Sequence, residues 1–462
     1  MRNLIFVVCL VFYAVANAGP PIPDIYRDRY LLHGAHYIRS EAVIDDALDY
    51  VTIASGDEIA AVAYVDESED GQGIIRAFVL HFDRWGRQLH ERVEFAPGIA
   101  GEAVVQVARH NDRTAVLFRE PFTHRYWLRS YTSDGAPLSE PTLALDAVAV
   151  PSNAIYISVG DDRIIVCAVG ATPEDNGIGR IYARPFGLDA QPLHDLIQVA
   201  TPESGVFYSA TVELQADGAA LLTYGNSATP RVYRSFAQRI TDTFELDSAI
   251  VREDAGRGLA SDLATGGYML NEYRYDSQAD DWIPQVIEVD ASGVPIGAPL
   301  QTDPAQIVSR ALRSGRFCEL SFPWPNPLRI RLFDDEWNAL GPSQEFITPQ
   351  WAAEATRQFV RDPMTYDETG TIWVVWFTRE SSPFGDHFVT ALTPYIPGDM
   401  NRDGLVNNFD IDAFVFALSN LPGYAATYNI PEDAAIIIGD INEDGVLNNF
   451  DIDPFVILLA GE

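Results

Sequence analysis

The sequence repeats one short pattern seven times, and this repeat constrains the fold more than any other feature of the chain. In each copy a tight polar turn precedes an apolar strand, as in Gly56-Asp57-Glu58 before IAAVAYV. The seven strands read IAAVAYV, TAVLF, IIVCAV, AALLTY, YMLNEY, FCELSF and IWVVWF. Successive copies lie about 49 to 55 residues apart, a spacing typical of the blades of β-propellers rather than of helical solenoids.

A second pattern keeps the same spacing. A β-rich run ends in a turn and an aliphatic residue, and the six copies end at Leu89, Leu138, Leu193, Leu246, Ile296 and Leu340. Each unit therefore holds three or four short strands joined by hairpin turns. Seven such units predict an all-β fold, a seven-bladed β-propeller over residues 19–392. A pair of β-sandwiches is the alternative, and the even spacing disfavours it.

The pattern also predicts details of the blades. We expect the apolar strand after each polar turn to be the third strand of its blade, half-buried against the next blade. Cys167 and Cys318 lie on such strands in the third and sixth units. Units that far apart do not touch in a ring, so two buried free thiols are expected. Residues 30–44 are expected to supply the inner strand of the first blade.

The charge balance excludes some functions. Asp and Glu total 66 against 31 basic residues, all of them arginine, which gives a formal charge of −35. Such an anion is repelled by phosphate backbones, so nucleic acid is excluded as a partner. The lack of lysine excludes a Schiff base on a lysine side chain and a lysine general base. Arginine in place of lysine with excess acid fits a saline habitat or a GC-rich genome equally well.

The N-terminus has the pattern of a secretory signal peptide over residues 1–18. Arg2 supplies a positive charge, residues 4–15 form an apolar run, and Ala16-Asn17-Ala18 is a small-x-small cleavage site. The run is too short for a membrane span, and no other stretch reaches about 18 apolar residues. The sequence therefore predicts a secreted, extracellular protein with no membrane span, held at the cell surface or released, and we expect a monomer.

Two near-identical segments follow a Pro-containing linker at residues 393–397, and they are offset by 41 residues. Each opens with a twelve-residue loop that carries oxygen side chains at positions one, three, five and twelve, with glycine at six. The predicted ligands of the first loop are Asp399, Asn401, Asp403, the backbone carbonyl of Leu405, and Asp410. Those of the second loop are Asp440, Asn442, Asp444, the carbonyl of Val446, and Asp451. Hard oxygen ligands at this spacing predict two Ca²⁺ ions, and Mg²⁺ fits less well.

An apolar pattern at helical spacing follows each loop, from Ile411 to Leu418 and from Ile452 to Leu459. We expect two loop–helix units without a leading helix. This duplicated pattern resembles the type I dockerin domain over about 65 residues, 398–462, and is most similar to the NNFDID-containing repeats of planctomycete-type secreted proteins. The resemblance implies a small α-helical module that folds around two Ca²⁺ ions and binds a cohesin.

In the dockerin family, loop positions ten and eleven select the partner. Here they are Asn408-Phe409 and Asn449-Phe450, identical in both copies, and the resemblance implies two symmetry-related binding modes. The sequence departs from the cellulosomal pattern, because Asn-Phe replaces a small hydroxyl pair and the basic pair on the helix is missing. This departure affects pairing with a standard cohesin but not calcium binding. Internal packing of the two Phe side chains is the alternative.

The sequence leaves the catalytic residues unknown, since it contains no GxSxG, HExxH or nucleotide-binding glycine loop. Acidic segments at residues 66–70, 174–176 and 276–281 are expected between the third and fourth strands, as a cation-binding face or as a solvated rim. The favoured function is a non-catalytic recognition protein whose propeller binds an extracellular glycan or protein. A dockerin-borne polysaccharide hydrolase or lyase and a cell-surface structural component are the alternatives.

Overall fold

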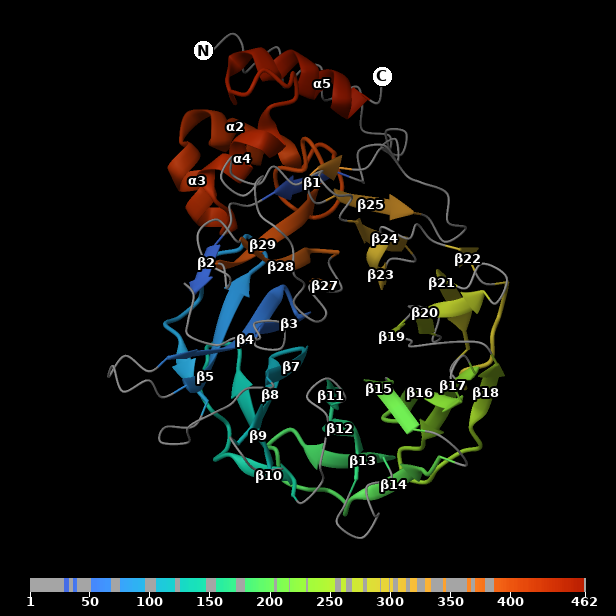
Figure 1. The fold of residues 1–462 in the computed structure, drawn as a ribbon. Helices are drawn as coiled ribbons and strands as arrows, with labels where there is room; N and C mark the ends of the chain where they lie inside the picture. Colours follow the sequence, from blue (N-terminus) through green and yellow to red (C-terminus); the bar gives the residue numbers. More distant parts are fainter. Residues whose placement is uncertain are drawn as a thin grey trace. The chain divides into compact units, whose positions relative to one another are not determined.

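In the computed structural model (Figure 1), the described residues are mainly in β-strands, followed by a helical C-terminal segment. The structure describes residues 29–32, 36–39, 51–67, 75–95, 105–120, 125–146, 155–171, 179–202, 206–215, 217–229, 232–253, 259–262, 268–276, 281–290, 292–298, 300–301, 306–312, 316–321, 329–333, 344–345, 364–366, 370–378 and 386–460. The predicted signal peptide, Leu340 and the acidic residues 68–70 and 174–176 lie outside these ranges.

The described strands form seven antiparallel sheets, numbered here in chain order. Sheet 1 contains β3 (Val51–Gly56), β4 (Ile59–Glu67), β5 (Ile75–Asp83) and β6 (Val93–Glu94). Sheet 2 contains β7 (Val105–His110), β8 (Arg113–Arg119), β9 (Tyr126–Thr132) and β10 (Thr142–Leu145). Sheet 3 contains β11 (Ile155–Val159), β12 (Arg163–Gly170), β13 (Arg180–Gly187) and β14 (Ile197–Ala200).

The remaining sheets continue in the same order. Sheet 4 contains β15 (Val206–Leu214), β16 (Ala220–Thr229), β17 (Val232–Ile240) and β18 (Ile250–Glu253). Sheet 5 contains β19 (Leu259–Asp262), β20 (Tyr268–Asp276), β21 (Asp281–Val289) and β22 (Leu300–Gln301). Sheet 6 contains β23 (Gln306–Leu312), β24 (Arg316–Ser321), β25 (Arg329–Phe333) and β26 (Gln344–Glu345). Sheet 7 contains β27 (Met364–Tyr366), β28 (Ile372–Thr378), β29 (Asp386–Tyr395), β1 (Arg29–Leu32) and β2 (His36–Arg39).

The first strands of successive sheets contact one another in a closed order. Strand β3 contacts β7, β7 contacts β11, β11 contacts β15, and β15 contacts β19. The order continues from β19 to β23 and from β23 to β27, and β27 contacts β3 again. The sheets of residues 51–378 therefore follow one another around a ring with their first strands innermost, as consecutive antiparallel units with short connections favour.

The apolar strand after each polar turn is the second strand of its sheet, so its expected assignment as the third strand was wrong. In sheet 1, for example, β3 and β4 pair across the turn at Asp57 and Glu58, with Gly56 opposite Ile59. Both turn residues have positive φ, 53° and 59°, as a tight hairpin turn between antiparallel strands requires. The strand before each turn is less apolar in sequence, which is why the sequence pattern missed it. The described residues of the acidic segments accordingly follow a second strand and not a third: Asp66 and Glu67 end β4, and Asp276 at the end of β20 pairs with Asp281 at the start of β21.

The buried core explains the apolar character of the second strands. Residues Ile164 to Gly170 of β12 are all buried, because such a strand is covered by neighbouring sheets on both of its faces. Cys167 is fully buried and free, and burial raises the pKa of its thiol well above the usual range. It therefore packs as a small apolar side chain, as predicted. Cys318 lies on β24 in sheet 6, where only the backbone is described.

The N-terminal strands belong to the last sheet and not to the first. Strand β1 pairs with the end of β29, with Leu31 opposite Thr393, and β2 pairs with the start of β29, with His36 opposite Val389. The expectation that residues 30–44 form the inner strand of the first blade was therefore wrong, since β3 has that place. The pairing joins the two ends of the β-rich region in one sheet, so the ring is closed by backbone hydrogen bonds.

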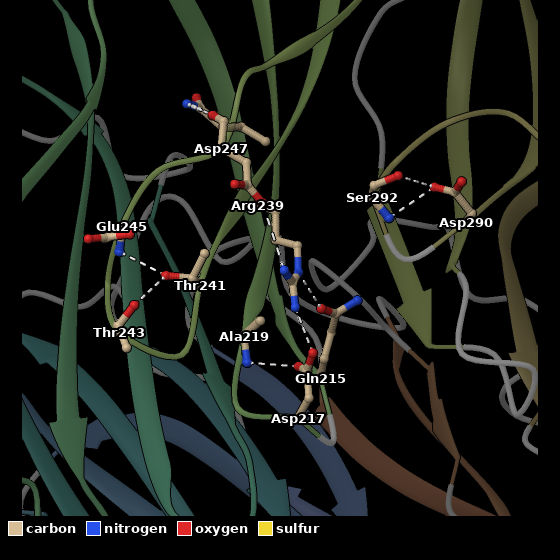
Figure 2. Close-up of polar contacts among 11 residues, drawn as sticks. Gln215, Asp217, Ala219, Arg239, Thr241, Thr243, Glu245, Asp247, Asp290 and Ser292 are labelled. Atoms are coloured by element: carbon tan, nitrogen blue, oxygen red, sulfur yellow. Dashed lines mark hydrogen bonds and ion pairs between the residues drawn. The ribbon is translucent and has the colours of Figure 1, made fainter.

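The aliphatic residues of the second sequence pattern lie at a recurring turn after the third strand. In sheets 1 to 5 the backbone N–H of this residue, or of the residue after it, donates a hydrogen bond to a backbone carbonyl of the third strand. In sheet 1, for example, Leu89 donates to the carbonyl of His81 (2.9 Å). One turn residue has positive φ, and it is Gly86, Gly135, Ala190, Phe244 or Gly293 in sheets 1 to 5. Asp290 caps the turn of sheet 5 by accepting a hydrogen bond from the backbone N–H of Ser292 (2.9 Å, Figure 2). It also accepts one from the backbone N–H of Val294 (2.9 Å).

This turn also contacts the preceding sheet. A Cβ added to Gly293 would lie 2.7 Å from the Cβ of Ala237 in sheet 4. The ring of Phe244 in sheet 4 lies 5.5 Å from that of His194 in sheet 3. Glycine is required at Gly293 because its φ is +89° and because no side chain fits in that space. The recurring turn thus sets how closely successive sheets pack.

The C-terminal segment contains α2 (Asp410–Ser419), α3 (Leu421–Tyr428), α4 (Glu432–Gly439), the 3₁₀ turn η5 (Asn449–Asp451) and α5 (Ile452–Ala460). Helices α2 and α5 confirm the helical pattern predicted after each loop. Helix α4 ends immediately before the second loop, with Asp440 as its C-cap, so the expectation that both loops lack a leading helix was wrong for the second loop. Three residues of the predicted linker, 393–395, continue β29.

The chain divides into two compact units, one comprising Gly34–Ala391 and the other Leu392–Glu462 with Met1–His33. Within the C-terminal unit, the rings of Phe414 on α2 and Phe455 on α5 stack with their centroids 4.1 Å apart. Both side chains are buried and occupy equivalent places in the two sequence repeats. No helix in the described part of the chain combines the length and hydropathy that a membrane crossing requires.

Candidate metal centre

The first predicted loop runs from Asp399 to Asp410 and gathers backbone N–H groups around two carboxylates. The Asp399 carboxylate accepts hydrogen bonds from the backbone N–H groups of Asp403 (3.1 Å) and Gly404 (3.0 Å). Gly404 has φ of +85° and open space around it, which lets the chain reverse at position six. The loop is therefore folded back on its first ligand residue.

Asp410 closes the first loop from the first residue of α2 and is completely buried. Its two carboxylate oxygens accept from the backbone N–H groups of Asn401 and Asn407, each at 2.8 Å. Asn407 in turn accepts from the backbone N–H of Phe409 (2.8 Å), so position nine caps the turn that begins the helix. The ligand spacing of the loop did not reveal this cap.

The second loop repeats the same bonding. Asp440 accepts from the backbone of Asp444 (3.0 Å) and Gly445 (2.7 Å). Asp451 is completely buried and accepts from the backbone of Asn442 (3.2 Å) and Asn448 (2.8 Å). The structure thus places the predicted ligand residues of both loops in matching positions. Each loop has one buried carboxylate, Asp410 at the first residue of α2 and Asp451 at the end of η5, directly before α5.

The electrostatics of the first loop favour a cation. Burial, followed by the nearby charge of Asp410, raises the pKa of Asp399 to about 6. Burial also raises the pKa of Asp410 above its ordinary value. Carboxylates that converge away from water destabilise each other's charged forms, and a divalent ion bound among them removes this cost. The shift therefore marks a place where positive charge would be favourable.

The donor set fits a hard cation only when amide and carbonyl oxygens take part. Among the described residues, no three carboxylate, imidazole or thiol groups are close enough to form a metal-binding group by themselves. Asn401 and the carbonyl of Leu405 in the first loop, with Asn442 and the carbonyl of Val446 in the second, would complete the shells. A mixed shell of carboxylate, amide and carbonyl oxygens is the type that Ca²⁺ takes.

The four partner-selecting residues predicted from the sequence are on the surface. The side chains of Phe409 and Phe450 are 72% and 78% exposed, so the alternative in which they pack internally was wrong. Asn408 and Asn449 beside them are exposed as well. Large aromatic side chains this exposed are uncommon on soluble surfaces and are typical of contact positions.

A second polar cluster lies between sheets 1 and 2. His81 is completely buried, and its Nδ1 lies 2.7 Å from Nε2 of His90, while its Nε2 lies 2.9 Å from the hydroxyl of Thr114. Arg109 donates to the same hydroxyl (2.8 Å) and also, through Nε, to the carbonyl of Gly56 (2.9 Å). Burial, then the charges of Arg109 and His90, lower the pKa of His81 well below its ordinary value.

The acidic turns of sheets 3 and 4 border a cleft of about 270 Å³. Asp217 there accepts from the guanidinium of Arg239 (2.6 Å) and the backbone of Ala219 (2.9 Å), as Figure 2 shows. Asp161 accepts from Nε2 of His110 (2.8 Å). Because these carboxylates are already paired within the protein, the cleft is poorly suited to capture a free cation.

Comparisons with known proteins add three distant structural similarities. No family model and no curated protein sequence matches the chain. The β-propeller domain of the Trilobed protease from Pyrococcus furiosus is 8% identical, with a TM-score of 0.45, covering 74% of this chain and 94% of that one. The Dos1 propeller is 11% identical, with a TM-score of 0.44 and coverages of 79% and 95%. An ulvan lyase of a polysaccharide lyase family is 10% identical, with a TM-score of 0.44 and coverages of 67% and 83%.

Proposed function

We propose that this protein is a calcium-dependent docking protein in which a seven-bladed β-propeller is joined to a dockerin-like module. The observation that carries the proposal is the duplication of the loop. Two segments 41 residues apart place equivalent carboxylates at equivalent backbone N–H groups, each before a helix or 3₁₀ turn. Acidic surface loops selected only for solubility would have no reason to share this geometry.

The propeller assignment is supported by the order of the sheets. The cyclic contacts of the first strands and the seven sequence repeats, about 49 to 55 residues apart, both support seven units. Closure of the last sheet by the N-terminal strands is a device that holds a ring of blades together, because backbone hydrogen bonds then join the first and last parts of the β-rich region. In this proposal the propeller is a recognition scaffold for an extracellular glycan or protein.

Calcium would organise the C-terminal module in this proposal. Asp399, Asp403 and Asp410 would hold the first ion, and the corresponding acids of the second loop would hold the other. A bound Ca²⁺ supplies two positive charges where carboxylates converge, and the free energy of binding is then available for folding. The chain itself supplies the remaining parts, namely the buried aspartate that closes each loop and the positive-φ glycine at position six.

The chemistry of the exposed face indicates the kind of partner. Each exposed Phe is followed three residues later by an exposed acid, Asp412 on α2 and Asp453 on α5. Residues 403–462 contain no Arg, Lys or His. A partner that fits this face has an apolar pocket for a phenyl ring and basic groups at its rim. We propose a cohesin-like protein that binds one of the two equivalent faces at a time.

Calcium titration of the full chain tests the proposal. We expect isothermal titration calorimetry to show two Ca²⁺ ions bound per chain, with a gain of helical circular dichroism over the chelated protein. Asp403→Ala with Asp444→Ala should abolish both signals. The control pair, Asp412→Ala with Asp453→Ala, removes equal charge outside the loops and should retain both ions. Absence of calcium binding by the folded wild-type chain would refute the proposal.

A further inference from the structure

Helix α3 contacts the first loop directly through a buried tyrosine. The Tyr424 hydroxyl donates a hydrogen bond of 2.7 Å to the backbone carbonyl of Met400, at position two of the loop. Both residues are completely buried. Burial raises the pKa of this phenol, so the hydroxyl stays protonated and available as a donor. The bond joins two segments 24 residues apart.

A second contact links the same helix to the same loop. Arg402, at position four, donates to the carbonyl of Tyr428 at the C-terminal end of α3 (3.1 Å). The last carbonyls of a helix lack partners within it and carry partial negative charge, so a guanidinium is favourable there. Arg402 has φ of +63°, and this left-handed backbone directs the loop between two of its ligand residues.

The ring of Tyr424 is held in place by its neighbours. It lies 4.8 Å from the ring of Tyr428 and 6.3 Å, edge to face, from that of Phe416 on α2. The hydroxyl is therefore fixed by ring packing against one residue of its own helix and one residue of α2. A donor fixed in this way holds the loop backbone at little further cost in conformational entropy.

We infer that Tyr424 and Arg402 form a clamp that positions the first loop for its cation and ties occupancy of that loop to helix α3. The inference rests on the proposed calcium function and deepens it, because it assigns a regulatory contact to one of the two sites. The second loop has Glu443 at the position of Arg402, and a carboxylate cannot donate to a helix carbonyl. The two sites should consequently differ, although their ligand residues match.

Calcium titrations of full-length variants with one working loop test the clamp. Asp444→Ala leaves the first loop, and Asp403→Ala leaves the second. In the first background, Tyr424→Phe should weaken the remaining site by about threefold to tenfold, the effect of losing one buried hydrogen bond. In the second background it should change affinity by less than about twofold, because the clamp does not touch that loop. Thr427→Val is the matched control, because it removes an exposed hydroxyl of α3 that bonds only to the carbonyl of Gly423 in the same helix (2.8 Å) and not to the loop.

The outcomes separate the clamp from the proposed function. Equal weakening in both backgrounds would show that Tyr424 only stabilises the module and would overturn the clamp, as would no weakening in either. Calcium binding in neither background, with none by the wild type, would refute the proposed function itself. Arg402→Ala provides a second test if Tyr424→Phe does not fold. It should weaken the first site, and Arg402→Lys should restore it in part.

Discussion

The hydrogen bonds around Thr114 allow a quantitative prediction for the junction of sheets 1 and 2. His90 Nδ1 lies 2.6 Å from the carbonyl of Glu91, so that nitrogen carries a proton and Nε2 accepts from His81. His81 Nε2 must then accept from the hydroxyl of Thr114, which in turn accepts from Arg109. Each hydrogen bond in this series therefore has a defined donor and acceptor. The Thr114 hydroxyl links sheet 2 to sheet 1.

Replacing Thr114 by valine keeps the shape of the side chain and removes this hydroxyl. The buried acceptor on His81 then loses its donor, at a cost of about 1–3 kcal/mol. The bond from Arg109 to the hydroxyl is lost too, which adds about 1 kcal/mol. The free energy of unfolding should therefore fall by about 2–4 kcal/mol. Thr114 is fully buried, so solvent cannot replace the lost hydroxyl.

Urea unfolding, followed by intrinsic fluorescence, measures this change. The control is Thr114→Ser, which keeps the hydroxyl and loses one methyl group, and it should cost about 1 kcal/mol. If valine is no more destabilising than serine, the hydrogen-bond chain does not hold the sheets together and the reasoning is refuted. The β-strand itself is preserved in the valine variant, since valine and threonine are both branched at Cβ.

Three further outcomes are expected. The fold lowers the pKa of His81, so the neutral imidazole stabilises the folded state fully at pH values above the unfolded pKa of about 6.5. This contribution to the free energy of unfolding is lost as the pH falls below that value. Urea midpoints measured from pH 8 to 5 report the loss. Gly293→Val should destabilise by about 2–4 kcal/mol through strain and overlap, whereas Gly297→Ala, with open space around it, should be nearly neutral in the same assay. Phe409→Ala with Phe450→Ala should abolish capture of a cohesin-like partner while calorimetry still shows two Ca²⁺ ions; retained capture would refute the docking face.

Several features of the protein could be predicted from the sequence because they are local. The polar turns and apolar strands recur about every 49 to 55 residues, and a spacing of this length indicates β-sheet units. The ligand pattern of the two loops depends on alternation over twelve residues, which the chain carries without its surroundings. The helices after the loops could be predicted because each loop is followed by apolar residues three or four positions apart, from Ile411 to Leu418 and from Ile452 to Leu459. That spacing marks one face of a helix.

Other features depended on residues far apart in the chain, and the sequence pattern gave no sign of them. The pairing of β1 and β2 with β29 joins residues more than 300 positions apart, and local propensity says nothing about such a partner. Each apolar strand was predicted to be the third strand of its sheet and is the second. The prediction was wrong because the strand before it has a weaker apolar pattern. The role of Tyr424 has no sequence signal, because its hydroxyl reaches the carbonyl of Met400 only when α3 lies against the first loop.

The sequence by itself determined the repeat, the all-β character of the larger part and the two oxygen-rich loops, since each is encoded by neighbouring residues. Only the tertiary structure decided how the ring of sheets closes, that Phe409 and Phe450 are exposed, and that His81, Thr114 and Arg109 share one buried set of hydrogen bonds. The physical reason is the same in each case. Burial and long-range pairing depend on which surfaces meet, and that is a property of the whole fold rather than of any segment.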